Sequence, residues 1–580
     1  MGRFNLLDEP WISVLVERTG EKKDVSMVEF FRNASDYYSL AGEMETQNFA
    51  VMRFLLSVIH TVFSRFDYDG NVLPGVSLDE RWIQTEDVDE DDWEEYDEAV
   101  SECWKRLYLT GIFPEVLFNY LEKWRNRFYL FDEKFPIFQV NKKEMDEILV
   151  KISEDDPTFI YGRNINRTIS ESENKIALFS PIKNTEIAMK RKKPRKKKDG
   201  TKDILTEAEL ARWLVMFHGY TGQGEKKRLV KKSSNGWLYD LGGIFLRGGN
   251  IFETLVINYI PGSPDDNQNF IGRIQKPCWE VSGREVIDRL CRERFIDNLA
   301  ELYTNWSRAI HINADTNMSK PLELGVIKLP AIEHTEISIE PMTLWEWKDK
   351  EKCFYPKKHN VEESLWRHFG IITIKETNDE KIHRSPGILK QYKRLKDVAG
   401  NRWTDIVGVS MESGDNKASQ EPVGEVTDSF QINDLVITDT DYNGWVIRIS
   451  DAVETTKEII SKIFNRYLEG ICEIRNLELT KPNANGFVSE EIKKMYSIID
   501  SAFKEWLASI KPSDSKEAKI IEWYSQLRKM VLNRVEELFE CSTVRDLTGI
   551  KNKKGIENIA VKYWEFVNTI NKKLVKGGKP

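Results

Sequence analysis

The C-terminal part of the chain repeats apolar residues at steps of three and four positions, which is the spacing of an amphipathic helix. The repeat begins near Asp451 and falls into four stretches. Their apolar positions are Val453, Ile459, Ile460, Ile463, Tyr467, Leu468 and Ile471; Ile492, Met495, Ile499, Phe503, Trp506, Leu507 and Ile510; Ile521, Tyr524, Leu527, Val531, Val535 and Leu538; and Ile556, Ile559, Tyr563, Phe566, Val567, Ile570 and Leu574. Long amphipathic helices with short connections predict a four-helix bundle.

The connections between these stretches carry turn and capping residues. The sequence KPNANG at residues 481–486 predicts a turn, and Pro512 interrupts the second stretch. Asp514 with Glu517 three residues later predicts a capping box at the start of the third helix.

The preceding residues have no single period and mix helix and strand patterns. VMRFLLSVIHTVF from Val51 and LARWLVMFHGY from Leu210 predict buried helices. WISVLV from Trp11 and ETLVINYI from Glu253 predict strands, and the polar segment Gly400–Val426 predicts a long loop. The fold class is therefore α+β, with many loops.

Length and composition agree with a globular protein of more than one domain. The chain has 580 residues, which exceeds the roughly 250–300 residues of one hydrophobic core. We expect a mixed α/β domain over 1–440 and a four-helix bundle over 441–580. Hydrophobic residues make up 40% and charged residues 31%, and no apolar run reaches the length of a membrane span.

Cysteine and histidine give no sign of a metal or redox site. The six cysteines include no C-x-x-C pair, and the seven histidines form no H-E-x-x-H or H-x-H motif. Asp8 and Glu9 stand where a signal peptide would have its apolar run. We therefore expect a cytoplasmic protein with reduced thiols, no cofactor and no membrane partner.

Two charge blocks interrupt this picture. The formal net charge is -9, yet eight of the nine residues at 190–198 are basic, while Glu86–Glu98 holds ten acids in thirteen positions. Either block can be a solvated surface segment; the acidic one can also dock a protein, and the basic one can contact nucleic acid. Glycine-rich sequence near the basic run favours close approach to a phosphate backbone. The expected phosphate contacts are Lys190, Arg191, Lys192, Lys193, Arg195, Lys196, Lys197, Lys198, Lys226, Lys227, Arg228 and Arg247.

One glycine-rich segment resembles a phosphate-binding loop only in part. Gly219–Gly224 has the glycine spacing of a P-loop, but Glu225-Lys226-Lys227 follows where that loop needs Lys-Ser/Thr. Nucleotide hydrolysis is therefore not expected.

Five segments in order along the chain resemble a known family. They are FNLLDEPWISV (4–14), NRFYLFDEKFPIFQV (126–140), ENKIALFS (173–180), LTEAELARWLVMFHGYTGQG (205–224) and LGGIFLRGGN (241–250). They are similar to segments of CasA, the large subunit of the type I-E CRISPR surveillance complex Cascade. The helical C-terminal pattern also fits that family.

The resemblance implies a role without catalysis. A subunit of this family sits near the 5′ end of the guide RNA, inspects duplex DNA for a short protospacer-adjacent motif and helps to open the duplex. It then provides a landing surface for the helicase–nuclease. Its implied partners are the other Cascade subunits, guide RNA, double-stranded target DNA and the helicase–nuclease. Base pairing reads the target sequence, and the protein reads the short motif and the shape.

Two loops of this sequence correspond to family segments that meet RNA and DNA. Asn174, Phe179 and Ser180 match the loop that contacts the guide RNA and the motif-bearing DNA, although Glu173-Asn174-Lys175 replaces the family's Gly-Asn-Asn. Asn416 and Lys417 precede Ala-Ser at the family's strand-separating wedge, with Lys417 where the family usually has Gln.

Two further segments correspond to elements that enter the DNA minor groove in the family. The sequence Lys350-Glu351-Lys352 resembles the segment that carries a groove-inserting lysine, and Lys352 is the better match. Gly242 and Gly243 match a glycine-rich loop at the same groove. Two other classes remain open: a scaffold subunit that does not bind DNA, and a nucleic-acid-processing enzyme.

Overall fold

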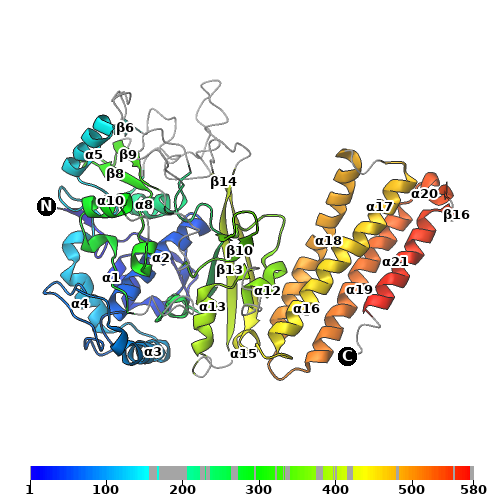
Figure 1. The fold of residues 1–580 in the computed structure, drawn as a ribbon, viewed down its shortest axis with the longest axis horizontal. Coiled ribbons are helices and arrows are strands. Elements are labelled where there is room, and N and C mark those ends of the chain that lie inside the picture. Colours follow the sequence, from blue (N-terminus) through cyan, green and yellow to red (C-terminus); the bar gives the residue numbers. More distant parts are fainter. Residues whose placement is uncertain are drawn as a thin grey trace. The chain divides into compact units, whose positions relative to one another are not determined.

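The computed structural model contains two units (Figure 1). It describes residues 2–155, 166–168, 205–222, 229, 235–262, 272–292, 296–319, 323–330, 332, 340–373, 383–395, 398, 402–413, 422–477, 482–552 and 555–574. The first unit is Met1–Asn360, Asn378–Val398 and Ile406–Asp428, and the second is Val361–Thr377, Ala399–Asp405 and Ser429–Pro580. In the described residues no helix is both long enough and apolar enough to cross a membrane. The mixture of helices and small sheets confirms the α+β class.

Short strands in small sheets make up the β structure of the first unit. The sheet orders are β1-β5, β3-β2-β4, β6-β9-β8, β11-β10-β12 and β14-β13-β7. The strands are β1 (Arg3–Asn5), β2 (Ile12–Val16), β3 (Lys22–Val25), β4 (Tyr37–Leu40), β5 (Tyr129–Phe131), β6 (Asn166–Thr168), β7 (Gly243–Arg247), β8 (Arg308–Ile312), β9 (Glu323–Lys328), β10 (Trp345–Lys348), β11 (Cys353–Pro356), β12 (His383–Arg384), β13 (Trp403–Ser413) and β14 (Pro422–Asn433). The predicted strand after Trp11 is confirmed as β2. Strands β13 and β14 each cross the boundary between the units.

Helix α2 lies at the centre of the first unit. It packs against α4, α8, α9 and α11, and nearly all of its residues are buried, as expected for a helix that is apolar all round. The helices are α1 (Met27–Arg32), α2 (Glu45–Phe63), α3 (Trp93–Thr110), α4 (Glu115–Lys123), α5 (Lys142–Asp155), α8 (Glu207–Tyr220), α9 (Ile251–Asn258), α10 (Gly283–Arg292), α11 (Leu299–Tyr303) and α13 (Gly387–Tyr392). The helices predicted from Val51 and Leu210 are confirmed as α2 and α8.

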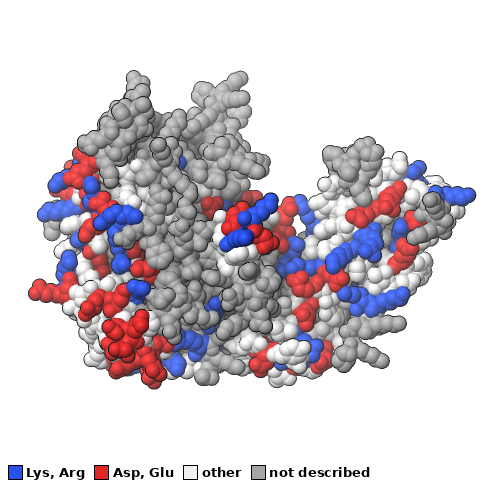
Figure 2. Space-filling model, viewed as in Figure 1, with Lys and Arg blue, Asp and Glu red and all other residues white. Residues whose placement is uncertain are grey.

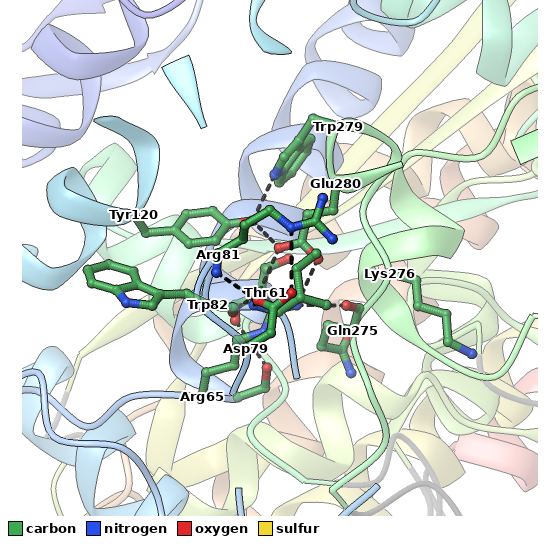
Figure 3. A network of polar contacts seen from close by, with 12 residues as sticks. Thr61, Arg65, Asp79, Arg81, Trp82, Tyr120, Gln275, Lys276, Trp279 and Glu280 are labelled. Atoms are coloured by element: carbon green, nitrogen blue, oxygen red, sulfur yellow. Dashed lines mark hydrogen bonds and ion pairs between the residues drawn. The ribbon is translucent and has the colours of Figure 1, made fainter. Parts of the chain in front are cut away.

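A buried polar network ties the turn that follows α2 to α4 and to the segment before α10 (Figure 3). The guanidinium of Arg65 donates to both carboxylate oxygens of Glu280, at 2.6 and 3.0 Å. The Tyr120 hydroxyl donates to the same carboxylate at 2.6 Å, and Trp279 Nε1 donates to the Tyr120 oxygen at 2.8 Å. Burial raises the pKa of Tyr120, so the phenol keeps its proton as a donor. Removing one partner of such a pair costs about 3–5 kcal/mol.

The strand predicted from Glu253 is wrong, because these residues form helix α9. The Asn250 side chain caps this helix by accepting a hydrogen bond from Glu253 N at 2.8 Å. The apolar run is buried on all sides, so it has no period that distinguishes a strand from a helix. The capping residue Asn250, directly before the apolar run, was the feature of the sequence that could have indicated a helix.

The predicted loop Gly400–Val426 is also wrong in its described part, because β13 and the start of β14 occupy it. Strand β13 is central in its sheet, with β7 on one side and β14 on the other. Ile406, Val409 and Met411 are buried there. Pairing with β14 and with the distant strand β7 outweighs the polar local composition.

Long helices that pack side by side dominate the second unit (Figure 1). Its elements are α12 (Phe369–Thr373), α15 (Asp434–Ile437), α16 (Trp445–Glu458), a π-helical turn (Ile459–Phe464), α17 (Asn465–Ile474), α18 (Pro482–Ser509), α19 (Lys516–Glu540), α20 (Val544–Thr548), β15 (Ile550–Asn552), β16 (Gly555–Glu557) and α21 (Ile559–Leu574). Helix α16, the π-helical turn and α17 are continuous. Helix α19 contacts α16, α18 and α21, and α17 contacts α18 and α21.

An aromatic cluster fills one part of the core between these helices. The rings of Trp366 and Phe503 stack with centroids 4.2 Å apart, and Trp523 meets Phe503 at 4.9 Å and Trp506 at 5.4 Å. Each large ring buries apolar area, and the pairs add about 0.5–1.5 kcal/mol each. The cluster holds α18 and α19 together.

The predicted apolar stripes differ from the structure at a few positions. The predicted third stripe contains Ile521, but in the structure Ile521 is 54% exposed. Trp523, which the prediction left out, is fully buried in its place. Ile556 lies in β16 and is 62% exposed. The other predicted positions are buried or half-buried.

Two helix starts also differ from the prediction. Helix α18 begins at Pro482, so most of the predicted turn is helical. The cap of α19 is Ser515, whose hydroxyl accepts from Ala518 N, while Asp514 accepts from Lys511 N at 2.9 Å. Proline suits the first helical turn because its missing N–H has no helical partner there.

Candidate nucleic-acid interface

The two lysines predicted to enter the minor groove lie at the tip of a β-hairpin. Strands β10 and β11 are antiparallel, and Lys348 pairs with Cys353 in the last register position before the turn. The turn residues 349–352 are all exposed. Lys350 and Lys352 therefore present their ammonium groups to solvent. On the face seen in Figure 2, basic and acidic side chains gather together over β10.

Lys352 has an unusual backbone conformation. Its φ angle is 53°, in the left-handed region that a residue with a side chain adopts at a cost of about 1–2 kcal/mol. Its amide donates to the carbonyl oxygen of Lys348 at 2.8 Å, which closes the turn. Strained residues of this kind concentrate at functional sites. The structure thus distinguishes Lys352 from its neighbour Lys350.

Aromatic residues support the hairpin on its two faces. On one face the rings of Trp347 and Phe354 meet edge to face at 5.1 Å. On the other, the ammonium of Lys348 lies 4.1 Å from the centroid of the Tyr355 ring. Trp347 Nε1 also donates to the Asp349 carboxylate at 3.0 Å. These contacts restrict the motion of the tip.

A buried ion pair fixes the chain just before β10. Arg53 of α2 donates to both oxygens of Glu340, at 2.7 and 2.8 Å, and both side chains are almost fully buried. Trp237 Nε1 donates to the same carboxylate at 2.7 Å. These bonds lower the pKa of Glu340 and keep it charged despite its burial. The hairpin is therefore anchored to the central helix.

Gly242 and Gly243 lie at the base of this hairpin and not at its tip. A Cβ atom on Gly242 would lie 2.0 Å from the carbonyl oxygen of Lys357, and one on Gly243 would lie 2.7 Å from the ring of Phe49. Both glycines are buried. Lys357 and Lys352 flank β11 and lie five residues apart, or roughly 16 Å along an extended chain. Packing alone accounts for these glycines, and their approach to a DNA groove stays a prediction.

Lys358 is a basic residue beside the glycine pair that sequence reasoning missed. Its ammonium lies 4.4 Å from the centroid of the Tyr239 ring. Burial lowers the pKa of Lys358 to about 8, while the charges of Asp240 and Glu412 oppose that shift. No local pattern marks it, because the partners come from two other parts of the chain, one at Tyr239 and Asp240 and one at Glu412.

The remaining predicted contacts fall into two groups. Arg247 ends β7 and is half-buried beside an apolar pocket of about 60 Å³ that Phe49 and Phe245 also line. The others lie outside the described residues: Asn174, Phe179, Ser180, Lys190, Arg191, Lys192, Lys193, Arg195, Lys196, Lys197, Lys198, Lys226, Lys227, Arg228, Asn416 and Lys417.

The acidic block Glu86–Glu98 leads into helix α3, where Figure 2 shows acidic side chains gathered. Asp87 pairs with Arg273, and Asp97 pairs with Arg394 at 2.9 Å. Most of the other acids are exposed, near a helix N-terminus that favours negative charge. The block is therefore partly structural.

Comparison with known proteins identifies the class of this chain. The model of the family "CRISPR-associated protein Cse1" matches residues 5–533. A curated relative, CRISPR-associated protein CasA/Cse1 of Thermus thermophilus, is 26% identical over 380 residues, which are 64% of this chain and 60% of the relative. The chain thus matches less than two thirds of that relative's length.

Solved structures with the same fold include members of this family. Thermobifida fusca Cse1 superposes with a TM-score of 0.72 at 20% identity, over 99% of this chain and 98% of that one. A chain of a CRISPR RNA-guided surveillance complex superposes with a TM-score of 0.62 at 13% identity, over 98% and 100%. The chain belongs to the CRISPR-associated protein Cse1 family, as the sequence resemblance predicted.

Proposed function

We propose that this protein is the large subunit of a type I-E CRISPR RNA-guided surveillance complex. Its family membership and the likeness of its whole fold to a chain of such a complex support this role. Its partners are then the other protein subunits of the complex and the guide RNA, in the cytoplasm. The subunit itself catalyses no reaction.

Within that complex the protein recognises the protospacer-adjacent motif in duplex DNA and promotes strand opening, so that an R-loop forms. The observation that carries this proposal is the hairpin tip, which presents Lys350 and Lys352 on a rigid, anchored support. The protein then provides the landing surface for the helicase–nuclease.

Lysine chemistry sets how the motif is read. An ammonium group only donates hydrogen bonds, and the minor groove offers the similar acceptors adenine N3 and thymine O2. A lysine at the tip therefore distinguishes base pairs coarsely. We expect this protein to accept several related motifs.

The test uses the complex reconstituted with its guide RNA. Lys350→Ala with Lys352→Ala should weaken gel-shift binding of a duplex that carries the motif by tenfold or more, since a hydrogen bond from a charged group contributes about 1.5–3 kcal/mol. Lys142→Ala is the matched control, because that exposed lysine pairs with Asp146 on α5. Equal binding by the double variant and the control would reject the assignment of the hairpin. If the wild-type complex, the double variant and the control all fail to bind duplex DNA, a scaffold role is favoured.

A further inference from the structure

The segment that follows β5 forms a rigid, exposed turn that the proposed function does not use. The Asp132 carboxylate accepts hydrogen bonds from the backbone amides of Lys134 and Phe135, both at 2.8 Å. On the other side, Asn141 Nδ2 donates to the carbonyl oxygen of Lys134 at 2.9 Å. The Phe135 ring is 38% exposed at this turn. Three hydrogen bonds thus hold an aromatic residue at the surface.

An arginine stacks on this ring. The guanidinium carbon of Arg127 lies 3.6 Å from the centroid of Phe135, and its Nη1 donates to the carbonyl oxygen of Val281 at 3.2 Å. Burial and the nearby charge of Arg81 lower the pKa of Arg127. Charged groups in such surroundings are usually paired with an opposite charge. In the described part of the chain, however, no carboxylate forms an ion pair with Arg127 or Lys134.

The same residues line a small pocket. Together with apolar residues that include Ile137, Trp279 and Trp306, they line a space of about 20 Å³, which has room for one oxygen atom of the size of a water. Glu144 also lines the pocket, but its two oxygens accept hydrogen bonds from Asn141 N at 2.9 Å and Arg284 N at 3.2 Å. The carboxylate therefore has its own structural partners. The guanidinium has N–H groups left to donate.

We propose that Arg127, Lys134 and Phe135 bind one nucleotide of an unpaired nucleic-acid strand. A phosphate oxygen enters the pocket and accepts from Arg127, Lys134 neutralises the same phosphate, and the base stacks on Phe135. The exposed ring favours a nucleotide over an acidic peptide, because every base has a face that stacks on an aromatic side chain. This contact is separate from the hairpin and extends the proposed function.

The test measures fluorescence anisotropy of labelled oligothymidylate and oligouridylate with the full-length protein. Phe135→Ala should weaken binding about 5- to 150-fold, as measured for loss of base–aromatic stacking. Lys134→Gln should flatten the slope of log K against log salt by about 0.7 for a lost contact with a single strand. The matched control is Tyr442→Ala, which removes an aromatic side chain that is 92% exposed elsewhere. Weakening with only one oligonucleotide would support the site and assign it to DNA or to RNA.

Two results would overturn the inference. One is unchanged binding of both oligonucleotides by Phe135→Ala. The other is binding of a labelled polyglutamate peptide with no binding of either oligonucleotide, which would assign the pocket to an acidic protein segment. Duplex capture by the assembled complex should stay unchanged in Phe135→Ala. Failure of this site and failure of the hairpin assignment can therefore be told apart.

Discussion

Replacing Lys352 by glycine separates the backbone contribution of this residue from that of its side chain. Its φ of 53° costs a residue with a side chain about 1–2 kcal/mol, which glycine does not incur. Glycine adds about 0.5–1 kcal/mol of entropy cost on folding. The net effect of Lys352→Gly is a gain of up to about 1.5 kcal/mol in the free energy of unfolding. Both Lys352→Gly and Lys352→Ala remove the ammonium group, and with it the proposed contact to DNA.

Two measurements on the same variants test this reasoning. Urea unfolding should show Lys352→Gly to be more stable than the wild type, and Lys352→Ala should not gain stability. In the assembled complex, both variants should lose motif-dependent binding by roughly 10- to 150-fold. If Lys352→Gly binds the motif as well as the wild type, the side chain does not contact DNA. If the glycine variant is less stable, the left-handed turn is not strained.

Four other predictions address the loops and the acid stability. Replacing the basic residues of Lys190–Lys198 by Gln should weaken DNA binding equally for all sequences and flatten the salt slope by up to about 0.9 per lost phosphate contact; an unchanged slope would mark the run as solvated. Phe179→Ala should impair entry into the guide-RNA complex without lowering the melting temperature of the isolated protein; a lower temperature would instead place Phe179 in a core. Lys417→Ala should reduce strand opening, followed by 2-aminopurine fluorescence, more than duplex capture in a gel shift; normal opening would reject the wedge assignment. Burial and the charge of Arg53 lower the pKa of His60 from 6.5 to about 3, so the unfolded chain binds a proton that the folded chain does not, and stability falls as pH decreases below about 6.5. His60→Phe should reduce that loss in urea unfolding between neutral pH and about pH 4, and an unchanged pH profile would contradict the assignment.

Periodic segments were the most predictable part of the fold. The helices of the second unit follow from their apolar spacing, because one face of each must be buried, and α2 and α8 follow from their long apolar runs. Helix α9 and strand β13 were mispredicted for opposite reasons. The first is apolar on all sides, and the second is polar in sequence but lies between β14, the next strand along the chain, and the distant strand β7.

The candidate site was predictable only where its residues are adjacent in sequence. Lys350 and Lys352 belong to one turn, and the structure places both at one hairpin tip. Lys358 and Tyr239 are far apart in sequence, so their contact depends on tertiary packing that no local pattern encodes. The stacking of Arg127 on Phe135 could not be predicted either. The segment 126–140 contains both residues, but its sequence does not show that the chain folds back between them.

The close approach at Gly242 has a consequence for how substitutions in this protein are read. A methyl group there would overlap the carbonyl oxygen of Lys357, so selection for folding alone retains glycine at this position. A survey of tolerated substitutions would therefore score Gly242 as indispensable whether or not it ever meets DNA. Intolerance at Lys352 has the reverse meaning, because glycine fits that backbone better than lysine does. If lysine is nevertheless required at this position, the requirement comes from the function of its side chain and not from folding.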